Sequence, residues 1–125
     1  MLKYVLVFVG GGSGALARYL LSVALNNRVI EGFALGTVMA NLLGTFLIGI
    51  TSILLMHRYL DNVFVKELIT VGFLGGLTTF STFTLEAQVL YTQGRYGALG
   101  AYLGCNLIAG LVLLIAGKEL GRLYG

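Results

Sequence analysis

Residues 72–84 read Gly-Phe-Leu-Gly-Gly-Leu-Thr-Thr-Phe-Ser-Thr-Phe-Thr, and the interpretation of the whole chain depends on them. The stretch starts apolar, meets a Gly-Gly pair, and then becomes a run of hydroxyl side chains interleaved with two phenylalanines. It lies inside a segment long enough to cross a bilayer, where polar side chains are costly and usually functional. We therefore expect a membrane helix that is broken near mid-membrane.

The composition of the chain indicates an integral membrane protein. Of its 125 residues, 58% are hydrophobic and 10% are charged, and the mean hydropathy is +0.93. Soluble domains have about 45–50% apolar and about 25% charged residues. The net charge of +3 is too small and too dispersed to suggest nucleic-acid binding. The lone cysteine, Cys105, cannot form an internal disulfide.

Four apolar segments are separated by short polar clusters. They cover residues about 2–25, 33–56, 68–91 and 98–116. Each is close to the roughly 20 residues that a membrane-spanning helix needs. Barrel strands would be about half as long and would alternate polar with apolar residues. We predict a single all-α domain, residues 1–125, with four transmembrane helices.

Lysine and arginine are unevenly divided between the two predicted membrane faces. One face holds five of them and the other holds two: Lys3, Arg58, Lys66, Lys118 and Arg122 against Arg28 and Arg95. This bias favours a cytoplasmic N-terminus.

Glycines four residues apart predict close helix packing. Examples are Gly10 with Gly14 and Gly100 with Gly104. Because four helices enclose little space on their own, a lumen of any size suggests an oligomer.

Signs of an enzyme are sparse. The single histidine, His57, lies in a predicted loop, and most acids lie at helix ends or in loops. The run Gly10–Gly14 resembles a phosphate loop only superficially, because it lacks a preceding strand and a Lys-Ser/Thr ending. We predict that the protein is not an enzyme.

Several polar side chains fall inside the predicted helices. Arg18 lies about two turns before the end of the first helix, where it either extends to the interface or collects anions at a pore mouth. Asn41 has an amide with two N–H donors, which could serve an ion or an interhelical hydrogen bond. Thr37 precedes it by one turn, so both face the same way.

Tyr102 and Asn106 form a similar polar stripe on the fourth helix, one turn apart. Glu86 lies eight residues before Gly94, which places it about 12 Å deep at 1.5 Å per residue. It needs a partner or water there, and a water-filled vestibule would supply the water.

The central stretch predicts two sites of opposite preference. Gly75-Gly76 permits a helix break without proline. The carbonyl end of the first half attracts a cation and the N–H end of the second attracts an anion, while Thr78 and Thr79 are suited to capping the second half. The alternative is an ordinary glycine kink with a Ser/Thr packing face.

Two phenylalanines follow the break. Phe80 and Phe83 share a face of the second half, and the positive edges of their rings can line an anion path. Ser81 and Thr82 add hydroxyls beside them. With the Asn41 amide, these groups could replace part of an anion's hydration shell.

These residues are similar to the motifs of the Fluc or CrcB family of small bacterial fluoride channels. The likeness covers essentially the whole chain. It is carried by Gly-Gly-Ser-Gly-Ala-Leu-Ala-Arg-Tyr at 11–19, Gly-Thr-Val-Met-Ala-Asn-Leu-Leu-Gly at 36–44, and residues 72–83 of the central stretch.

The resemblance implies an antiparallel, dual-topology homodimer with two fluoride pores. It implies that Asn41, Phe80 and Phe83 line the pore and that Ser81 and Thr82 belong to its polar track. Thr37, Tyr102 and Asn106 join the same path, with Arg18 and Glu86 in the vestibule. It also implies a structural Na⁺ at the dimer interface, held by the backbone carbonyls of Gly75 and Thr78.

The function that the resemblance implies is a passive, fluoride-selective anion channel in the bacterial inner membrane. It would export cytoplasmic fluoride and so give resistance to fluoride. Two other classes remain open, a small proton-coupled multidrug exporter and a non-conducting membrane scaffold. The exporter needs a membrane-buried acid, usually in the first helix, where this chain has Arg18 instead.

Overall fold

The computed structural model describes residues 1–26, 34–57 and 62–125, and the secondary structure of this part of the chain consists of helices joined by short turns. Four spans are long and apolar enough to cross a membrane. The first two are α1 (Leu2–Asn26) and α2 (Leu35–Met56). The prediction of an all-α membrane protein with four spans is confirmed, and the predicted start of the second span near Phe33 lies outside the described residues.

The third and fourth spans are each assembled from shorter pieces. The third contains η1 (Phe64–Leu74), α3 (Gly75–Leu77) and α4 (Ser81–Thr92). The fourth contains α5 (Tyr96–Gly104), η2 (Cys105–Ala109) and α6 (Gly110–Tyr124). Both η segments are π-helical, a form that occurs frequently at functional sites.

Both of these spans are longer than the apolar pattern predicted. The third begins at Phe64 rather than near Leu68, and the fourth ends at Tyr124 rather than near Ala116. The hydropathy pattern predicts only the apolar part of each span. Lysine, glutamate and arginine are good helix formers, so the helix continues through them beyond the apolar part. An ion pair between Arg122 and Glu119 supports the last turns of α6.

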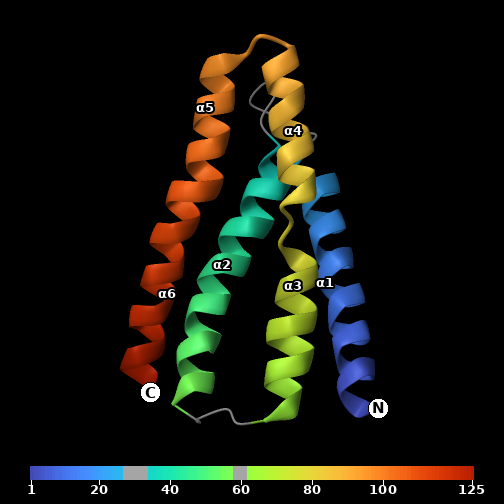
Figure 1. Cartoon of the computed structure of the whole chain (residues 1–125), viewed down its shortest axis with the longest axis vertical. Coiled ribbons are helices and arrows are strands. Elements are labelled where there is room, and N and C mark those ends of the chain that lie inside the picture. Colours follow the sequence, from blue (N-terminus) through green and yellow to red (C-terminus); the bar gives the residue numbers. More distant parts are fainter. Residues whose placement is uncertain (27–33, 58–61) are drawn as a thin grey trace.

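The spans lie side by side, with both termini at the same end of the molecule (Figure 1). α2 lies between α6 and the third span and packs against both. α1 packs against η1 and α3. At the other end a tight turn joins α4 to α5, and Gly94 adopts a left-handed conformation there (φ 70°).

Glycine sets how closely α1 approaches the third span. A methyl group added to Gly14 would lie 2.1 Å from the carbonyl oxygen of Phe73, and one added to Gly10 would lie 2.2 Å from that of Leu68. The predicted close packing is therefore present on α1. It is absent at Gly100 and Gly104, where an added methyl group would meet nothing within 4 Å among the residues that the structure describes.

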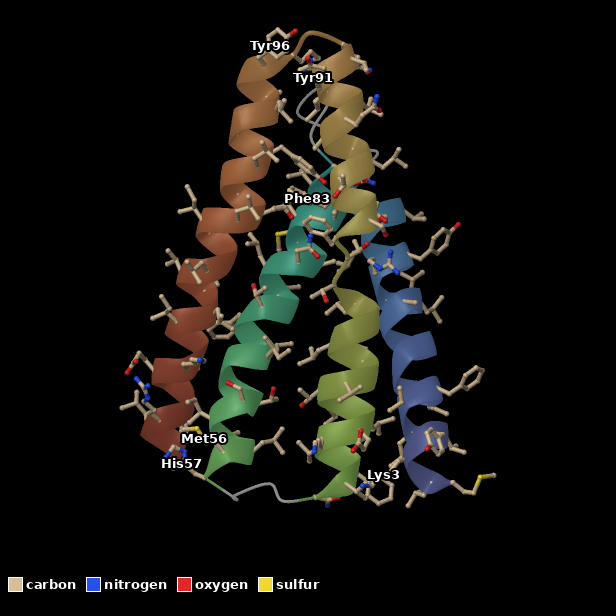
Figure 2. The ribbon with its side chains drawn as sticks, viewed as in Figure 1. Lys3, Met56, His57, Phe83, Tyr91 and Tyr96 are labelled. Carbon is tan, nitrogen blue, oxygen red and sulfur yellow. The ribbon has the colours of Figure 1, made fainter. Side chains whose placement is uncertain are left out.

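Large apolar side chains cover much of the outside of the molecule (Figure 2). Phe8 on α1 is 81% exposed and Ile108 on the fourth span is 70% exposed. A soluble protein of this size would bury such residues, whereas lipid accepts them. The surface of the spans is therefore that of a membrane protein.

Candidate functional site

The third span is interrupted at residues 78–80, which belong to no helix. Thr78 is extended (φ −81°, ψ 152°), whereas Gly75 is helical (φ −64°, ψ −36°). The predicted break is confirmed, but the expectation that the Gly75-Gly76 pair forms it is wrong. A methyl group on Gly76 would lie 2.3 Å from the carbonyl oxygen of Gly11, so this glycine serves the close approach of α1.

Asn41 on α2 forms hydrogen bonds with the non-helical backbone at the break. Its Oδ1 accepts a hydrogen bond from the amide of Thr79 (2.8 Å), and its Nδ2 donates to the carbonyl of Thr79 (3.1 Å). Both backbone groups of Thr79 would otherwise lack their helical partners, and leaving them unpaired inside a membrane would be costly. The side chain of Asn41 therefore replaces the hydrogen bonds that the broken helix has lost.

Two threonine hydroxyls form hydrogen bonds with backbone groups at the ends of the two half-helices. Thr79 Oγ1 accepts a bond from the amide of Thr82 (3.3 Å) and donates to Thr82 Oγ1 (3.2 Å), so it caps α4 as expected. Thr78 does not cap α4, because its hydroxyl donates back to the carbonyl of Leu74 (3.0 Å).

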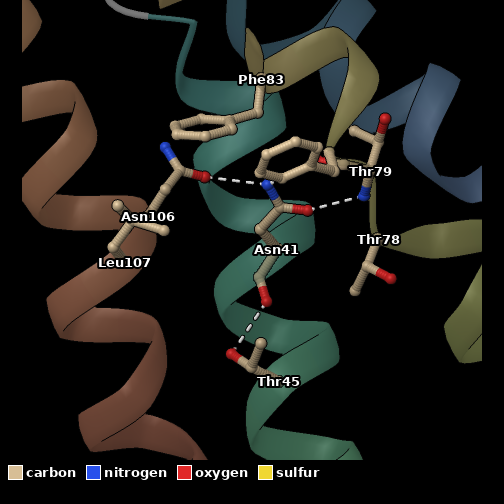
Figure 3. A pocket seen from close by; sticks show the side chains of 8 residues that line it. Asn41, Thr45, Thr78, Thr79, Phe83, Asn106 and Leu107 are labelled. Carbon is tan, nitrogen blue, oxygen red and sulfur yellow. Dashed lines mark hydrogen bonds between the residues drawn. The ribbon is translucent and has the colours of Figure 1, made fainter.

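A cavity of about 250 Å³ lies at the break (Figure 3). Eight residues line it: Asn41, Thr45, Thr78, Thr79, Phe80, Phe83, Asn106 and Leu107. The structure thus brings Asn41, Phe80, Phe83 and Asn106 together, as their predicted common role requires. Nδ2 of Asn41 also donates to Oδ1 of Asn106 (2.8 Å), which links α2 to the fourth span.

Sequence reasoning gave no role to Thr45 and Leu107, and it assigned Thr78 and Thr79 to capping or to Na⁺ but not to the lining of the cavity. Thr45 lies one helical turn after Asn41, and its hydroxyl donates to the carbonyl of Asn41 (2.9 Å). The four-residue spacing of Thr37, Asn41 and Thr45 was the signal that could have found it. Leu107 has no such signal in an apolar helix.

The two phenylalanines lie in different surroundings although they are neighbours. Their ring centroids are 5.6 Å apart with the planes tilted by 49°. Phe83 is 6% exposed and stacks on Tyr102, whereas Phe80 is 73% exposed. Phe80 therefore presents most of its ring to whatever lies outside this chain.

A second polar group lies next to the cavity, on the far side of Phe83. Thr37 donates to Oε1 of Glu86 (3.0 Å), and the hydroxyl of Tyr102 donates to its Oε2. Thr37 and Tyr102 are both buried, at 1% and 0% exposure. Glu86 therefore has protein partners at its depth, which the sequence left open. Thr37 belongs to this group and not to the lining of the cavity.

The remaining predicted site residues lie at the edges of the break. Nε of Arg18 donates to the carbonyl of Gly76 (3.1 Å). Ser81 is exposed at the start of α4, with its hydroxyl 3.5 Å from that of Thr79. Thr82 is half-buried against Thr79 and, like Ser81, does not line the cavity.

The backbone at the break suits a cation. In an unbroken helix the carbonyl of Gly75 would accept from the amide of Thr79, and that of Thr78 from the amide of Thr82. Those amides donate instead to Asn41 and to the Thr79 hydroxyl. Both carbonyl oxygens have thus lost their helical donors, and Gly75 lies on an exposed face. Carbonyl oxygens are ligands that hard cations accept, so these two residues fit Na⁺.

The fold and this site define a class of protein, a multi-pass membrane protein whose cavity, lined by amide, hydroxyl and aromatic side chains, lies at a helix broken inside the membrane. Such irregular backbone is tolerated at depth only when it is buried in protein or lines a wet cavity. It is a feature of proteins that handle ions.

The chain belongs to the family described as CrcB-like protein, Camphor Resistance (CrcB), whose profile matches residues 5–118. It is 40% identical over 120 residues to Fluoride-specific ion channel FluC 1 of Staphylococcus aureus (strain NCTC 8325 / PS 47), covering 96% of this chain and 97% of the relative. It is 41% identical over 122 residues to Fluoride-specific ion channel FluC of Hydrogenobaculum sp. (strain Y04AAS1), covering 98% and 99%.

Proposed function

We propose that this protein is a fluoride-selective passive anion channel that exports cytoplasmic fluoride across the bacterial inner membrane. It would thereby give resistance to fluoride, and it is not an enzyme. The observation that carries the proposal is the cavity at the break, where the Asn41 amide meets Phe80 and Phe83. The names of the relatives identify the anion.

Fluoride is small and strongly hydrated, so a pore must offer it donors in place of water. Asn41 has two N–H donors, of which one holds the carbonyl of Thr79 and the other holds Asn106. The second bond joins two side chains and can be exchanged for a bond to an anion. The first can then stay in place, so the break keeps its shape while an ion passes.

The rings of Phe80 and Phe83 complete the binding surface. Their positive edges attract an anion weakly, and weak binding is required if the ion is to leave again. The stack of Phe83 on Tyr102 then connects the cavity to the group of Glu86 and Thr37. We assign this group to the fluoride path towards the vestibule.

A second copy of the chain completes each pore in this proposal. The spans of residues 1–125 act as one domain, and two such domains pair in antiparallel orientation. The 73% exposure of Phe80 supports this arrangement, as do the open position of Gly75 and the exposed hydroxyl of Ser81. Na⁺ held by the carbonyls of Gly75 and Thr78 would lie between the two copies.

The test is anion efflux from liposomes that contain the purified protein. We expect fluoride efflux without chloride efflux. Asn41→Asp removes both donors and leaves their acceptors unpaired, so it should lower fluoride flux by about tenfold or more. Phe80→Ile removes the positive ring edge that attracts the anion, and it should lower the flux by about tenfold as well. Phe8→Ile is the matched control, because Phe8 is exposed on α1 away from the cavity.

Two outcomes would overturn the proposal. The first is proton movement that depends on a drug and occurs without fluoride flux, which is the behaviour of a multidrug exporter. The second is a well-folded protein that conducts no anion, as a membrane scaffold would.

A further inference from the structure

Arg18 is the one charged side chain described on α1 beyond its first turn, and it reaches the third span. Its Nε donates to the carbonyl oxygen of Gly76 at 3.1 Å, across 58 positions of sequence. Within the described ranges no carboxylate lies within ion-pair distance of it. The partner of this half-buried cation is therefore a backbone carbonyl at the end of a half-helix.

That carbonyl needs a donor because of the break. In a continuous helix the oxygen of Gly76 would accept from the amide of Phe80. The extended conformation of Thr78 prevents the helix from continuing to Phe80. The Gly76 oxygen instead accepts a hydrogen bond from Nε of Arg18 on α1.

The sequence of α1 places Arg18 where only a long side chain reaches. Gly10, Gly14 and Arg18 are four residues apart and so lie on one face. At Gly14 the two backbones touch, since a methyl group there would lie 2.9 Å from the amide nitrogen of Leu77. One turn further on, the first half-helix has ended, and the arginine spans the gap back to its last turn.

We propose that Arg18 is a positioning residue for the break, acting through its Nε–H and not through its net charge. It holds the end of the first half-helix from the side of α1, while Asn41 holds Thr79 from the side of α2. Together they fix Thr78 and Thr79, which form one wall of the cavity. The expected effect on conduction rests on the proposed channel function.

Three substitutions separate the hydrogen bond from the charge. Glutamine places its amide nitrogen the same number of bonds from Cα as Nε of arginine, so Arg18→Gln keeps a donor there without the charge. Methionine places a methyl group at that position, so Arg18→Met keeps the length without the donor. Lysine places a methylene there, so Arg18→Lys keeps the charge and moves the donor one atom further out.

We expect Arg18→Gln to stay within about threefold of the original fluoride flux and Arg18→Met to fall by about tenfold or more, because only the second leaves the Gly76 carbonyl unpaired. Arg18→Lys should fall between them. Equal losses for glutamine and methionine with lysine retaining flux would overturn the proposal, and would assign Arg18 to the collection of anions.

A spectroscopic measurement tests the contact without reference to conduction. The chain has two Gly-Leu pairs, Gly76-Leu77 and Gly110-Leu111. Labelling with carbonyl-¹³C glycine and ¹⁵N leucine therefore gives two carbon–nitrogen correlated NMR signals, and Gly110 is an internal reference. The Gly76 carbonyl shift should move upfield in Arg18→Met and stay near its original position in Arg18→Gln.

An unchanged Gly76 shift in Arg18→Met would sink the proposal even if flux fell. Conversely, a protein that carries no fluoride but shows the expected shifts would refute the channel function and leave the positioning role standing. If Arg18→Met does not fold, the comparison of Arg18→Gln with Arg18→Lys still decides between donor and charge.

Discussion

At the break, backbone carbonyls that lose their helical N–H donors become available as ligands for a cation. The oxygens of Gly75 and Thr78 are deprived of their helical donors because Asn41 and the Thr79 hydroxyl take the amides of Thr79 and Thr82. The carbonyl of Gly76, between them in sequence, is paired with Arg18. The carbonyls of Gly75 and Thr78 are therefore available to a cation, whereas that of Gly76 is already paired.

Removing sodium should lower both the fluoride flux and the fraction of dimer. We expect replacement of Na⁺ by N-methylglucamine, which is too large to enter between carbonyls, to lower fluoride flux by about tenfold or more, because carbonyls buried between the two proposed copies would then lack a partner. Flux and the dimer fraction from size-exclusion chromatography are measured in both media. Equal flux and equal dimer fraction with and without sodium would contradict the proposed Na⁺ site.

At this scale the sequence predicted the types of residue better than their partners. The spacing of Phe80 and Phe83 correctly predicted adjacent rings. The amide of Asn41 was recognised as a donor, but not that it brackets Thr79 on both sides. Likewise, the partners of Glu86 come from two other spans. Pairings across spans depend on how helices are rotated about their axes, and local patterns do not contain that information.

Among the elements, α1 and the third span are held at a close approach by glycine. Their contact is made by backbone atoms at Gly10, Gly14 and Gly76. The Gly-Gly pair was expected to break the helix because glycine is locally permissive. Tertiary structure overrides that tendency, since the break lies where Asn41 supplies replacement hydrogen bonds and the glycines lie where α1 needs room.

Two alanine substitutions one turn apart or less should behave oppositely. In Gly14→Ala the new methyl group would overlap the carbonyl of Phe73, so we expect a loss of about 1–3 kcal/mol of unfolding free energy. Gly12→Ala meets nothing within 4 Å, and it should be neutral or stabilising by up to about 1 kcal/mol, the helix preference of alanine over glycine.

Unfolding in detergent by a denaturant titration, followed by circular dichroism, compares the two variants. Gly12→Ala is the matched control for any general effect of removing a glycine from α1. Similar stability of the two variants would mean that the backbones of α1 and η1 are not in contact at Gly14.

At the scale of the whole molecule, the distribution of lysine and arginine bears on the orientation of the chain in the membrane. Lys3, Lys66, Lys118 and Arg122 lie on elements that end near the chain termini, and Arg95 lies at the opposite end, while Arg28 and Arg58 lie outside the described residues. Taken alone this bias favours a cytoplasmic N-terminus. The proposed antiparallel dimer would require both orientations, and the 73% exposure of Phe80 supports that dimer.

Cysteine labelling distinguishes the two cases. In a Cys105→Ala background, a cysteine replaces either Gly125 or Gln93, which are exposed at opposite ends of the fold. Dual insertion predicts that a membrane-impermeant maleimide labels about half of each variant on intact spheroplasts, because about half of the copies then present that end to the outside. One variant labelled fully and the other not at all would establish a single orientation.

The contact between Arg18 and Gly76 also has a consequence for synthesis. Its two residues are 58 positions apart, and at about 5–20 residues per second the ribosome needs about 3–12 s to make the intervening chain. Until the third span has been made, the glycine face of α1 and its arginine lack the partner that they have in the folded protein. The first helix must therefore wait in lipid, or beside the insertion machinery, for a partner that arrives only after α2 has been made.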